Sequence, residues 1–396
     1  MNLHPADRLS HDRAIVTQPV WNRFDSAADA VGLPRHTLLH AGPPLPEGVW
    51  PMPILNSACV AAVWEGLAAD FDAAEEGIRA GEIPLAPAQD HGVVTPLAAV
   101  VSASMPLHTV YDAHRGQVRV LAPINGGQGP APRLGLRSQA ALDHLRWMFG
   151  PLREVLERGI GEGIALLPLA AGALAAGDDC HGRTAAATAA LVQDLDRRTP
   201  GGIADDTVRE FLAASPSIFL NLWMAATKCL MRLAEGVEGS SFVVAAGGNG
   251  ATVGVQVAGL PGRWFTAPSA PPVGRLEGGV APERALPAIG DSAVVEAMGL
   301  GAMAWHLSPA QQEALGAFLP PDIAERRAQL LLGPHTEFAG LDLRLGLSAR
   351  AVAQTGLGPA VGLGILDRTG EAGRLGGGVY TMPPDPFSAA VRALAA

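Results

Sequence analysis

The sequence predicts an α+β fold, with two mixed α/β domains and a largely helical middle portion. Strand-like apolar runs bounded by glycine, proline and asparagine recur through the first third of the chain. Helical periodicity dominates the middle. An Asn-Gly pair between two apolar runs then predicts a β-hairpin in the last third. These three observations place the expected domains at 1–135 and 239–396, with the helical portion at 136–238.

The N-terminal third alternates strand-like and helical segments. Residues 1–35 show no clear period, so we interpret them as an irregular lead-in. A helix is expected over 56–80, because Asn56 or Ser57 can cap its start and Gly81 follows its end. The strands expected in this third lie at 37–40, 93–102 and 109–122.

The rest of the chain is helical first and then returns to strands. An interruption is expected at Pro216, since proline breaks the helical hydrogen-bond pattern. Residues 247–250 are expected to form a tight turn between strands at 242–246 and 252–257, because glycine and asparagine tolerate positive φ. A glycine-rich tail ends in a short helix. The other expected helices lie at 138–160, 183–198, 204–235, 292–304 and 309–332.

Composition excludes several classes of protein. The 396 residues are 48% hydrophobic and only 17% charged, so the chain can bury large cores and is not disordered. A net charge of -10 opposes nucleic acid as a partner, because that affinity comes from clustered Lys and Arg. Cys59, Cys180 and Cys229 are widely spaced, which supports neither a disulfide framework nor a structural zinc site.

The sequence also indicates where the protein works. Residues 1–15 carry charges and no apolar core, so no secretory signal is recognised. The longest apolar stretch, 163–177, is broken by Pro168 and falls short of the roughly 20 residues that span a bilayer. We therefore expect a cytoplasmic protein that binds a small anionic metabolite, not nucleic acid or a membrane.

The strongest candidate for an anion site is the segment 177–184, which precedes an alanine-rich helix. A helix start presents free amides and a positive dipole end, which attract carboxylate or phosphate. Asp179, His181 and Arg183 lie beside it, and we assign His181 to proton transfer. The alternative is that Asp178 or Asp179 only caps the helix.

No metal or cofactor site is expected. Adjacent residues such as Asp178, Asp179, Cys180 and His181 point in different directions and do not match usual ligand spacing. The glycines at 247–250 lack the Lys-Ser/Thr ending of a phosphate-binding loop, and a strand follows them instead of a helix.

A polar stripe follows the helix expected at 204–235. Asn221, Lys228, Arg232 and Glu235 share one face. Lys228 is the only lysine among 28 basic residues, which favours a functional ammonium group. The alternative is an ordinary solvated face, which is the usual fate of such a stripe.

Four further polar residues stand at the expected edges of elements. Asn249 can present its amide at the hairpin turn, and Arg263 lies near the start of an apolar run. Asp291 or Ser292 can cap the helix that follows them. Each is a candidate for binding substrate, although none is decisive alone.

Taken together, these segments resemble the AllG family of bacterial proteins, which are subunits of an oxamate carbamoyltransferase in allantoin degradation. The resemblance runs in order across residues 38–305 and is specific in combination. The matching pieces are residues 39–44, 104–106, 177–183, 220–221, 224–226, 228, 249–250, 263–268 and 289–292.

The resemblance is that of a divergent member of the family, because several polar positions of the family pattern are changed. Gly248 stands where the family has Arg, and Ala288 replaces an acid before Ile-Gly-Asp. Gly182 replaces an Asn, and an Asn-Glu-Gly motif is reduced to 125–127. The aliphatic segment 94–99 is only partly kept.

The resemblance implies a carbamoyltransferase subunit that acts on a small ureido or amide acid, such as oxamate, and on carbamoyl phosphate. It also implies purine nitrogen metabolism and partner subunits or a homo-oligomer. The alternative is a non-catalytic, metabolite-binding or scaffold subunit that keeps the pocket without the chemistry. The residues expected to bind substrate are Asp179, Arg183, Asn221, Lys228, Asn249, Arg263, Asp291 and Ser292, with His181 as the catalytic residue.

Overall fold

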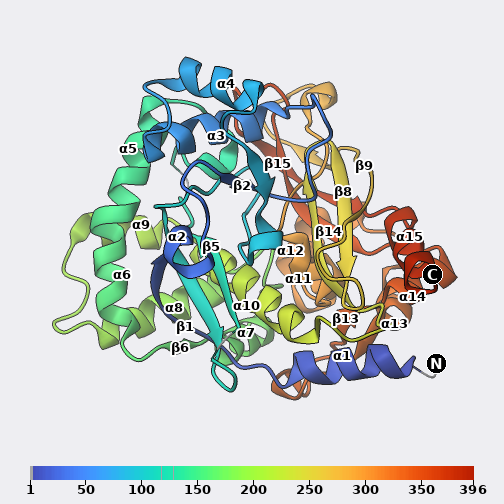
Figure 1. The fold of residues 1–396 in the computed structure, drawn as a ribbon. Helices are drawn as coiled ribbons and strands as arrows, with labels where there is room; N and C mark the ends of the chain where they lie inside the picture. The colour runs from blue at the N-terminus through green and yellow to red at the C-terminus, as the bar shows by residue number, and fades with distance from the viewer. Residues whose placement is uncertain (1–2, 117, 128) are drawn as a thin grey trace.

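Three larger antiparallel sheets organise the part of the chain that the structure describes (Figure 1). The computed structural model describes residues 3–116, 118–127 and 129–396. The first sheet has the strand order β5 (Arg119–Pro123), β4 (Pro106–Asp112), β1 (Pro19–Ser26) and β6 (Ile164–Ala165). The second has the order β11 (Ile289–Gly290), β7 (Val243–Asn249), β8 (Thr252–Val257) and β9 (Phe265–Pro268). The third has the order β10 (Val273–Leu276), β15 (Arg374–Thr381) and β14 (Ala360–Leu366).

Two small sheets and a set of helices complete the fold and confirm the predicted α+β class. The small sheets are the parallel pair β2 (Leu38–His40) with β3 (Leu85–Pro87), and the antiparallel pair β12 (Leu331–Gly333) with β13 (Leu345–Leu347). The helices are α1 (Pro5–Ile15), α2 (Ala27–Val31), α3 (Met52–Glu65), α4 (Phe71–Ala80), α5 (Gln139–Trp147), α6 (Arg153–Ile160), α7 (Leu166–Ala175), α8 (Ala185–Arg198), α9 (Asp206–Ala213), α10 (Ile218–Ala234), α11 (Ala293–Ala297), α12 (Pro309–Leu315), α13 (Ile323–Leu330), α14 (Ala349–Thr355) and α15 (Asp385–Leu394).

The expected irregular lead-in at 1–35 is wrong. This segment forms α1, β1 and α2, and β1 lies inside the first sheet with partners on both sides. A bulge between Trp21 and Arg23 shifts the register against β4. Because a bulge inserts one extra residue, it breaks the apolar alternation that would have revealed the strand.

Two other expected elements of the N-terminal third are also corrected. The helix expected at 56–80 is two helices, α3 and α4. Gly66 adopts φ 73° at the end of α3, a left-handed conformation that suits glycine, and the Asp70 side chain caps α4. The strand expected at 93–102 is an irregular segment with isolated bridges at Val93 and Val101.

The middle and the hairpin follow the sequence closely. The helices at 138–160, 183–198 and 204–235 are confirmed, with the last divided into α9 and α10 around Pro216. The hairpin is confirmed too, since β7 and β8 pair antiparallel. The turn is shorter than expected, because Gly247 and Gly248 lie within β7 and pair with Gly254 and Val253.

The main buried core includes residues of all three larger sheets and of α10, and Ala285, Ile365 and Leu375 form a small second cluster. α10 packs against β4 and β5 on one side and against β7 and α11 on the other. All of its residues except Leu220 and Arg232 are buried. The division at 135/136 and 238/239 remains a prediction, although β6 pairs with β1 across the first boundary. Within the described ranges, no helix is long and apolar enough to cross a membrane.

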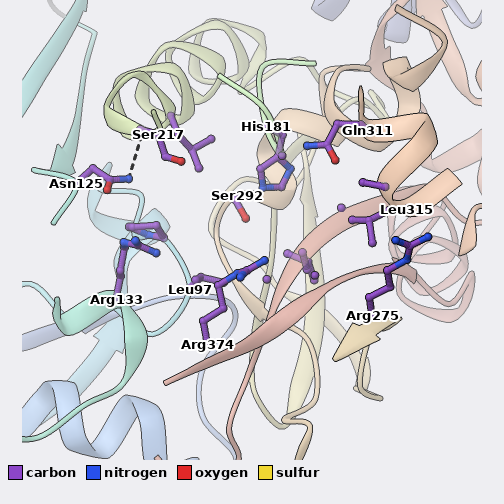
Figure 2. A pocket seen from close by; sticks show the side chains of 18 of the residues that line it. Leu97, Asn125, Arg133, His181, Ser217, Arg275, Ser292, Gln311, Leu315 and Arg374 are labelled. Carbon is purple, nitrogen blue, oxygen red and sulfur yellow. Dashed lines mark hydrogen bonds between the residues drawn. The ribbon is translucent and has the colours of Figure 1, made fainter. Parts of the chain in front are cut away.

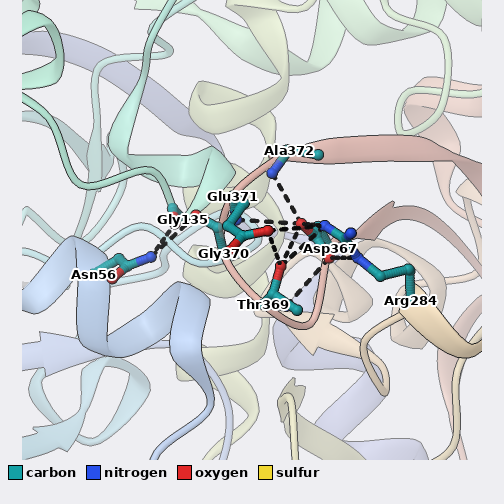
Figure 3. Close-up of polar contacts among 8 residues, drawn as sticks. All are labelled: Asn56, Gly135, Arg284, Asp367, Thr369, Gly370, Glu371 and Ala372. Carbon is teal, nitrogen blue, oxygen red and sulfur yellow. Dashed lines mark hydrogen bonds and ion pairs between the residues drawn. The ribbon is translucent and has the colours of Figure 1, made fainter.

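Polar contacts hold the loop between β14 and β15 in place and also tie it to the N-terminal half (Figure 3). The Asp367 carboxylate accepts hydrogen bonds from Arg284 Nε at 2.8 Å and from the Ala372 amide at 2.9 Å. Burial opposes its charge, but these bonds hold the pKa of Asp367 well below its usual value. The Asn56 amide donates to Gly135 O at 2.9 Å and to Gly370 O at 3.2 Å. This single side chain therefore bridges two distant loops.

Replacing Asn56 with Ala is expected to destabilise the protein by about 2 kcal/mol, because two buried carbonyls lose their donor. Urea unfolding at equilibrium measures the change. Gln139→Ala is the control, since that exposed amide bonds only to exposed Asp143 among the residues described. A loss no larger than that of the control would contradict the bridging role.

Candidate functional site

A cavity of about 450 Å³ opens between the third sheet, α12 and the start of α10 (Figure 2). This volume lies in the range of small-molecule sites. Residues from segments far apart in the sequence converge on it, which no local pattern reveals. Its polar lining includes Asn125, Arg133, His181, Arg275, Ser292 and Arg374.

His181 is held in the cavity by a buried carboxylate. Its Nδ1 lies 2.7 Å from Glu296 Oε1, and that oxygen also accepts bonds from the amides of Ala302 and Gly362, each at 3.1 Å. Burial would lower the pKa of His181, but attraction to Glu296 and to Asp179 outweighs it, so the pKa is raised. Because Nδ1 is occupied by Glu296, Nε2 is the ring nitrogen left to face a ligand. Sequence reasoning found His181 but not Glu296.

The turn that presents His181 is built around Asp179. Its carboxylate accepts hydrogen bonds from the amides of His181 and Arg183, both at 2.8 Å, and from the Trp305 indole. Cys180 adopts φ 61°, which this tight turn requires. Asp179 is fully buried and does not line the cavity. It therefore positions His181, and the structure gives it no direct access to a ligand in this cavity.

The expected anion site at the start of the following helix is already filled by the protein. Asp178 Oδ2 accepts a hydrogen bond from the Ala187 amide at 3.0 Å, so its carboxylate occupies the free amides of α8. Arg183 Nε lies 3.3 Å from Asp178 Oδ1, and the Arg183 side chain is 45% exposed and outside the cavity lining. The capping alternative holds for Asp178, and a second anion would meet a carboxylate there.

Three arginines that the sequence did not single out line the cavity instead. Arg133 is mostly buried, and no acidic side chain pairs with it among the residues described. Burial, together with the charge of Arg374, lowers the pKa of Arg133 to about 10. Arg374 Nη1 lies 2.6 Å from Glu277, whereas Arg275 makes no ion pair within the described part of the chain. The sequence contains many arginines, and only the fold brings these three together.

Asn221 supports the cavity wall from behind. It lies fully buried in α10, where its amide donates to Pro123 O at 2.7 Å. Its Oδ1 accepts from Asn125 Nδ2 at 3.3 Å, and Asn125 lines the cavity. Gly127 O, two residues on, accepts a hydrogen bond from Arg133. The reduced motif at 125–127 therefore stands at the cavity wall.

Lys228, Asn249 and Arg263 lie away from the cavity. Lys228 is fully buried, its Nζ donates to Val244 O at 2.6 Å, and burial lowers its pKa. The solvated-face alternative is therefore wrong for Lys228. The Asn249 amide donates to Pro43 O at 2.9 Å and its Oδ1 accepts from the Thr252 amide at 2.7 Å, which shapes the hairpin. The guanidinium of Arg263 stacks over a phenyl ring.

Ser292 and Asp291 are neighbours with different positions relative to the cavity. Ser292 lines the cavity. Asp291 is fully buried beneath it and accepts hydrogen bonds from the Gly42 amide at 2.8 Å, from Gln89 Nε2 at 2.7 Å and from the Thr95 amide at 2.9 Å. Burial raises the pKa of Asp291 to about 6. Asp291 therefore links the N-terminal loops to the segment that carries Ser292.

The chemistry of the cavity suits an anion. Guanidinium, imidazole, hydroxyl and amide groups face it, and the acidic side chain among the described lining residues, Glu277, is paired with Arg374. Such groups donate hydrogen bonds to carboxylate or phosphate and stabilise negative charge that develops during a reaction. Of the residues expected from the sequence, only His181 and Ser292 line this cavity, with Asp179, Asn221 and Asp291 behind them.

Three comparisons show which known proteins this chain is similar to. A sequence model described as "Oxamate carbamoyltransferase subunit AllG" matches residues 83–292. The oxamate carbamoyltransferase subunit AllG of Escherichia coli K12 is 34% identical over 91% of this chain and 89% of its own length. The uncharacterized protein YahG of the same organism is 32% identical over 98% of this chain and 84% of its own length. A crystal structure of a conserved protein of unknown function from Enterococcus faecalis V583 superposes with a TM-score of 0.91 at 28% identity, covering 98% of this chain and 97% of that one.

Proposed function

Because the chain belongs to the AllG family, we propose that it is a carbamoyl-transfer subunit whose cavity handles a small ureido or amide acid. The observation that carries this proposal is the meeting of His181, paired with buried Glu296, and three arginines around one cavity. AllG itself is described as a subunit, so partner subunits belong to the proposal.

The proposed reaction moves a carbamoyl group between an amide nitrogen and phosphate. When a phosphate oxygen attacks the carbamoyl carbon, a C–O bond forms and the C–N bond to the acid breaks. The leaving nitrogen takes the bonding electron pair and a proton from His181 Nε2. The raised pKa of His181 favours the protonated ring that this step needs. In the other direction His181 accepts the proton from the attacking nitrogen.

The arginines and hydroxyls supply the rest of the chemistry. A carboxylate and a phosphate must be held together, which converts an encounter of two anions into a reaction inside one site. Guanidinium groups offset their repulsion and hold them in a fixed geometry. Ser292 can donate to the carbonyl oxygen as negative charge builds on it.

Two of the departures from the family pattern do not reach the cavity. Gly248 and Ala288 are neighbours, since a Cβ on Gly248 would lie 2.4 Å from Ala288 O. An Arg at the first position and an acid at the second would stand side by side. Losing both removes a pair and leaves no unmatched charge in the interior. These two changes therefore give no support to a loss of catalysis.

A non-catalytic, metabolite-binding subunit is the second candidate, and one observation favours it. Gly182 lines the cavity next to His181, where the family pattern has an Asn. A Cβ there would lie 2.5 Å from Gln311 Nε2, so the Gln311 side chain would have to move to admit an Asn. The loss of a polar group at the wall alters what the cavity can hold.

The test is carbamoyl phosphate formation by the chain co-purified with its partner subunits. We expect the complex to form carbamoyl phosphate from phosphate and at least one member of a panel of ureido acids, including carbamoylated oxamate. A folded complex that binds these acids but transfers no carbamoyl group from any of them would favour the metabolite-binding candidate. Genes for the other transferase subunits next to the gene for this chain would support the enzyme.

A further inference from the structure

We infer that Arg133 and Arg374 form a subsite for a doubly charged phosphate group at one side of the cavity. This inference rests on the proposed function, and it assigns a place to the phosphate that the reaction uses. Figure 2 shows both guanidinium groups directed into the cavity, with His181 and Ser292 across from them.

Arg133 has the features of an anion-binding residue without its ligand. It is held by a hydrogen bond to Gly127 O, yet its buried Nε has no partner among the residues described. A buried charged group without an acidic partner is costly, because desolvation is not offset by an opposite charge. An anion in the cavity would remove that cost, and the planar guanidinium fits the oxygens of phosphate in a fork.

Arg374 is brought to Arg133 by the loops rather than by attraction. The Asn56 amide ties Gly135 O, two residues after Arg133, to Gly370 O, four residues before Arg374 (Figure 3). The two like charges repel, and this repulsion adds to burial, the larger cause, in lowering the pKa of Arg133. A fold that holds two such groups together against repulsion suits a ligand that carries more than one negative charge.

The charge of the cavity matches a dianion. The cavity is lined by three guanidinium groups and by the carboxylate of Glu277. With His181 protonated, its pair with Glu296 is neutral. Glu277, which is paired with Arg374, offsets one of the three guanidinium groups, so the net charge of these groups is +2. A phosphate dianion balances this charge, whereas a monocarboxylate balances only half of it.

Space near Arg374 is kept open by glycine. Gly377 lines the cavity, and a Cβ there would lie 3.5 Å from Arg374 Nη2 and 3.4 Å from a Leu315 methyl group. The neighbouring Gly376 and Gly378 let β15 approach β10, since a Cβ at either would clash with the backbone of Arg275 or Val273. The glycine run therefore brings Arg275 and Arg374 to the same cavity.

The experiment is calorimetric titration of the full chain with inorganic phosphate, above the second pKa of phosphate. We expect one phosphate per chain, and a loss of affinity of about tenfold or more in both Arg133→Gln and Arg374→Gln, because each removes a charge-assisted contact. Arg133→Lys should also bind more weakly than the wild type, since the charge remains but the fork is lost. Arg183→Gln is the matched control, and its affinity should equal that of the wild type.

Titrations with other ligands distinguish the source of the phosphate group and the kind of anion that binds. Carbamoyl phosphate should compete with inorganic phosphate for the subsite, whereas ADP at the same concentration should not. The affinity for oxamate, a monoanion, should fall less in Arg133→Gln than the affinity for phosphate does. Unchanged phosphate affinity in Arg133→Gln and Arg374→Gln, with both proteins folded by circular dichroism, would overturn the inference. So would a wild type that does not bind phosphate.

These outcomes are independent of the proposed function. If the complex forms carbamoyl phosphate but phosphate affinity is unchanged in Arg133→Gln, the proposed function is supported and the subsite is contradicted. A chain that binds phosphate through Arg133 and Arg374 in a complex without transfer activity keeps the subsite and removes the function.

Discussion

Replacing His181 with Gln is expected to lower carbamoyl transfer by the complex about 10²- to 10⁴-fold, which is the usual contribution of a positioned acid or base. Gln keeps a polar side chain of similar reach but carries no titratable proton. Phosphate affinity should fall less than in Arg133→Gln, because His181 lies outside the proposed phosphate subsite and only offsets the charge of Glu296. Steady-state rates at saturating substrate, measured with titration of phosphate, separate the two effects. His36→Gln changes an exposed histidine outside the cavity lining and is the control.

The partner of His181 gives this prediction a second readout. Glu296→Gln keeps an oxygen for the amides of Ala302 and Gly362 but removes the negative charge beside the ring. Burial then dominates and the pKa of His181 falls, with only Asp179 still raising it. If protonated His181 is the active form, activity declines as pH rises through this pKa. The declining limb of the pH profile should therefore move to lower pH in Glu296→Gln, and an unmoved limb would remove the pair from the mechanism.

Replacing Asp291 with Asn is expected to destabilise the protein by about 3 kcal/mol at neutral pH, because a buried acceptor of several hydrogen bonds becomes partly a donor. The amides of Gly42 and Thr95 and the Gln89 side chain all point hydrogens at this carboxylate. An Asn NH₂ group would face one of them with another hydrogen. Urea unfolding measures the loss, and exposed Asp143→Asn serves as the control.

The same variant predicts a pH dependence with a definite sign. The folded pKa of Asp291 is about 6, above the value of about 3.9 expected in the unfolded chain. Between these values the folded state binds a proton that the unfolded state has released, so stability falls as pH rises. The wild type should therefore gain stability relative to Asp291→Asn as pH falls from 7 toward 4, by at most about 1.4 kcal/mol per pH unit. A difference that shrinks instead would show that the hydrogen bonds, not burial, control this carboxyl group.

Local sequence patterns predict those parts of the protein that depend on neighbouring residues. Apolar periodicity predicted the helices of the middle, and the Asn-Gly pair predicted the hairpin of β7 and β8, because both are local properties of the backbone. The α+β class and the family resemblance followed from the order of such segments, and both are confirmed. His181 was also found in this way, since the motif that carries it is contiguous.

The tertiary structure decided which charged groups meet. Arg133 comes from a short 3₁₀ helix at 132–134, and Arg275 and Arg374 come from two strands. These three segments are far apart in the sequence, so no spacing marks their arginines. The sequence allows Asp178 or Asp179 to cap the helix, yet only the fold shows that the Asp178 carboxylate fills the helix start expected to bind an anion. The strand β1 was hidden for a related reason, since its bulge is fixed by pairing with β4 and not by its own residues. Contacts of this kind depend on distances between remote segments, which a linear pattern does not contain.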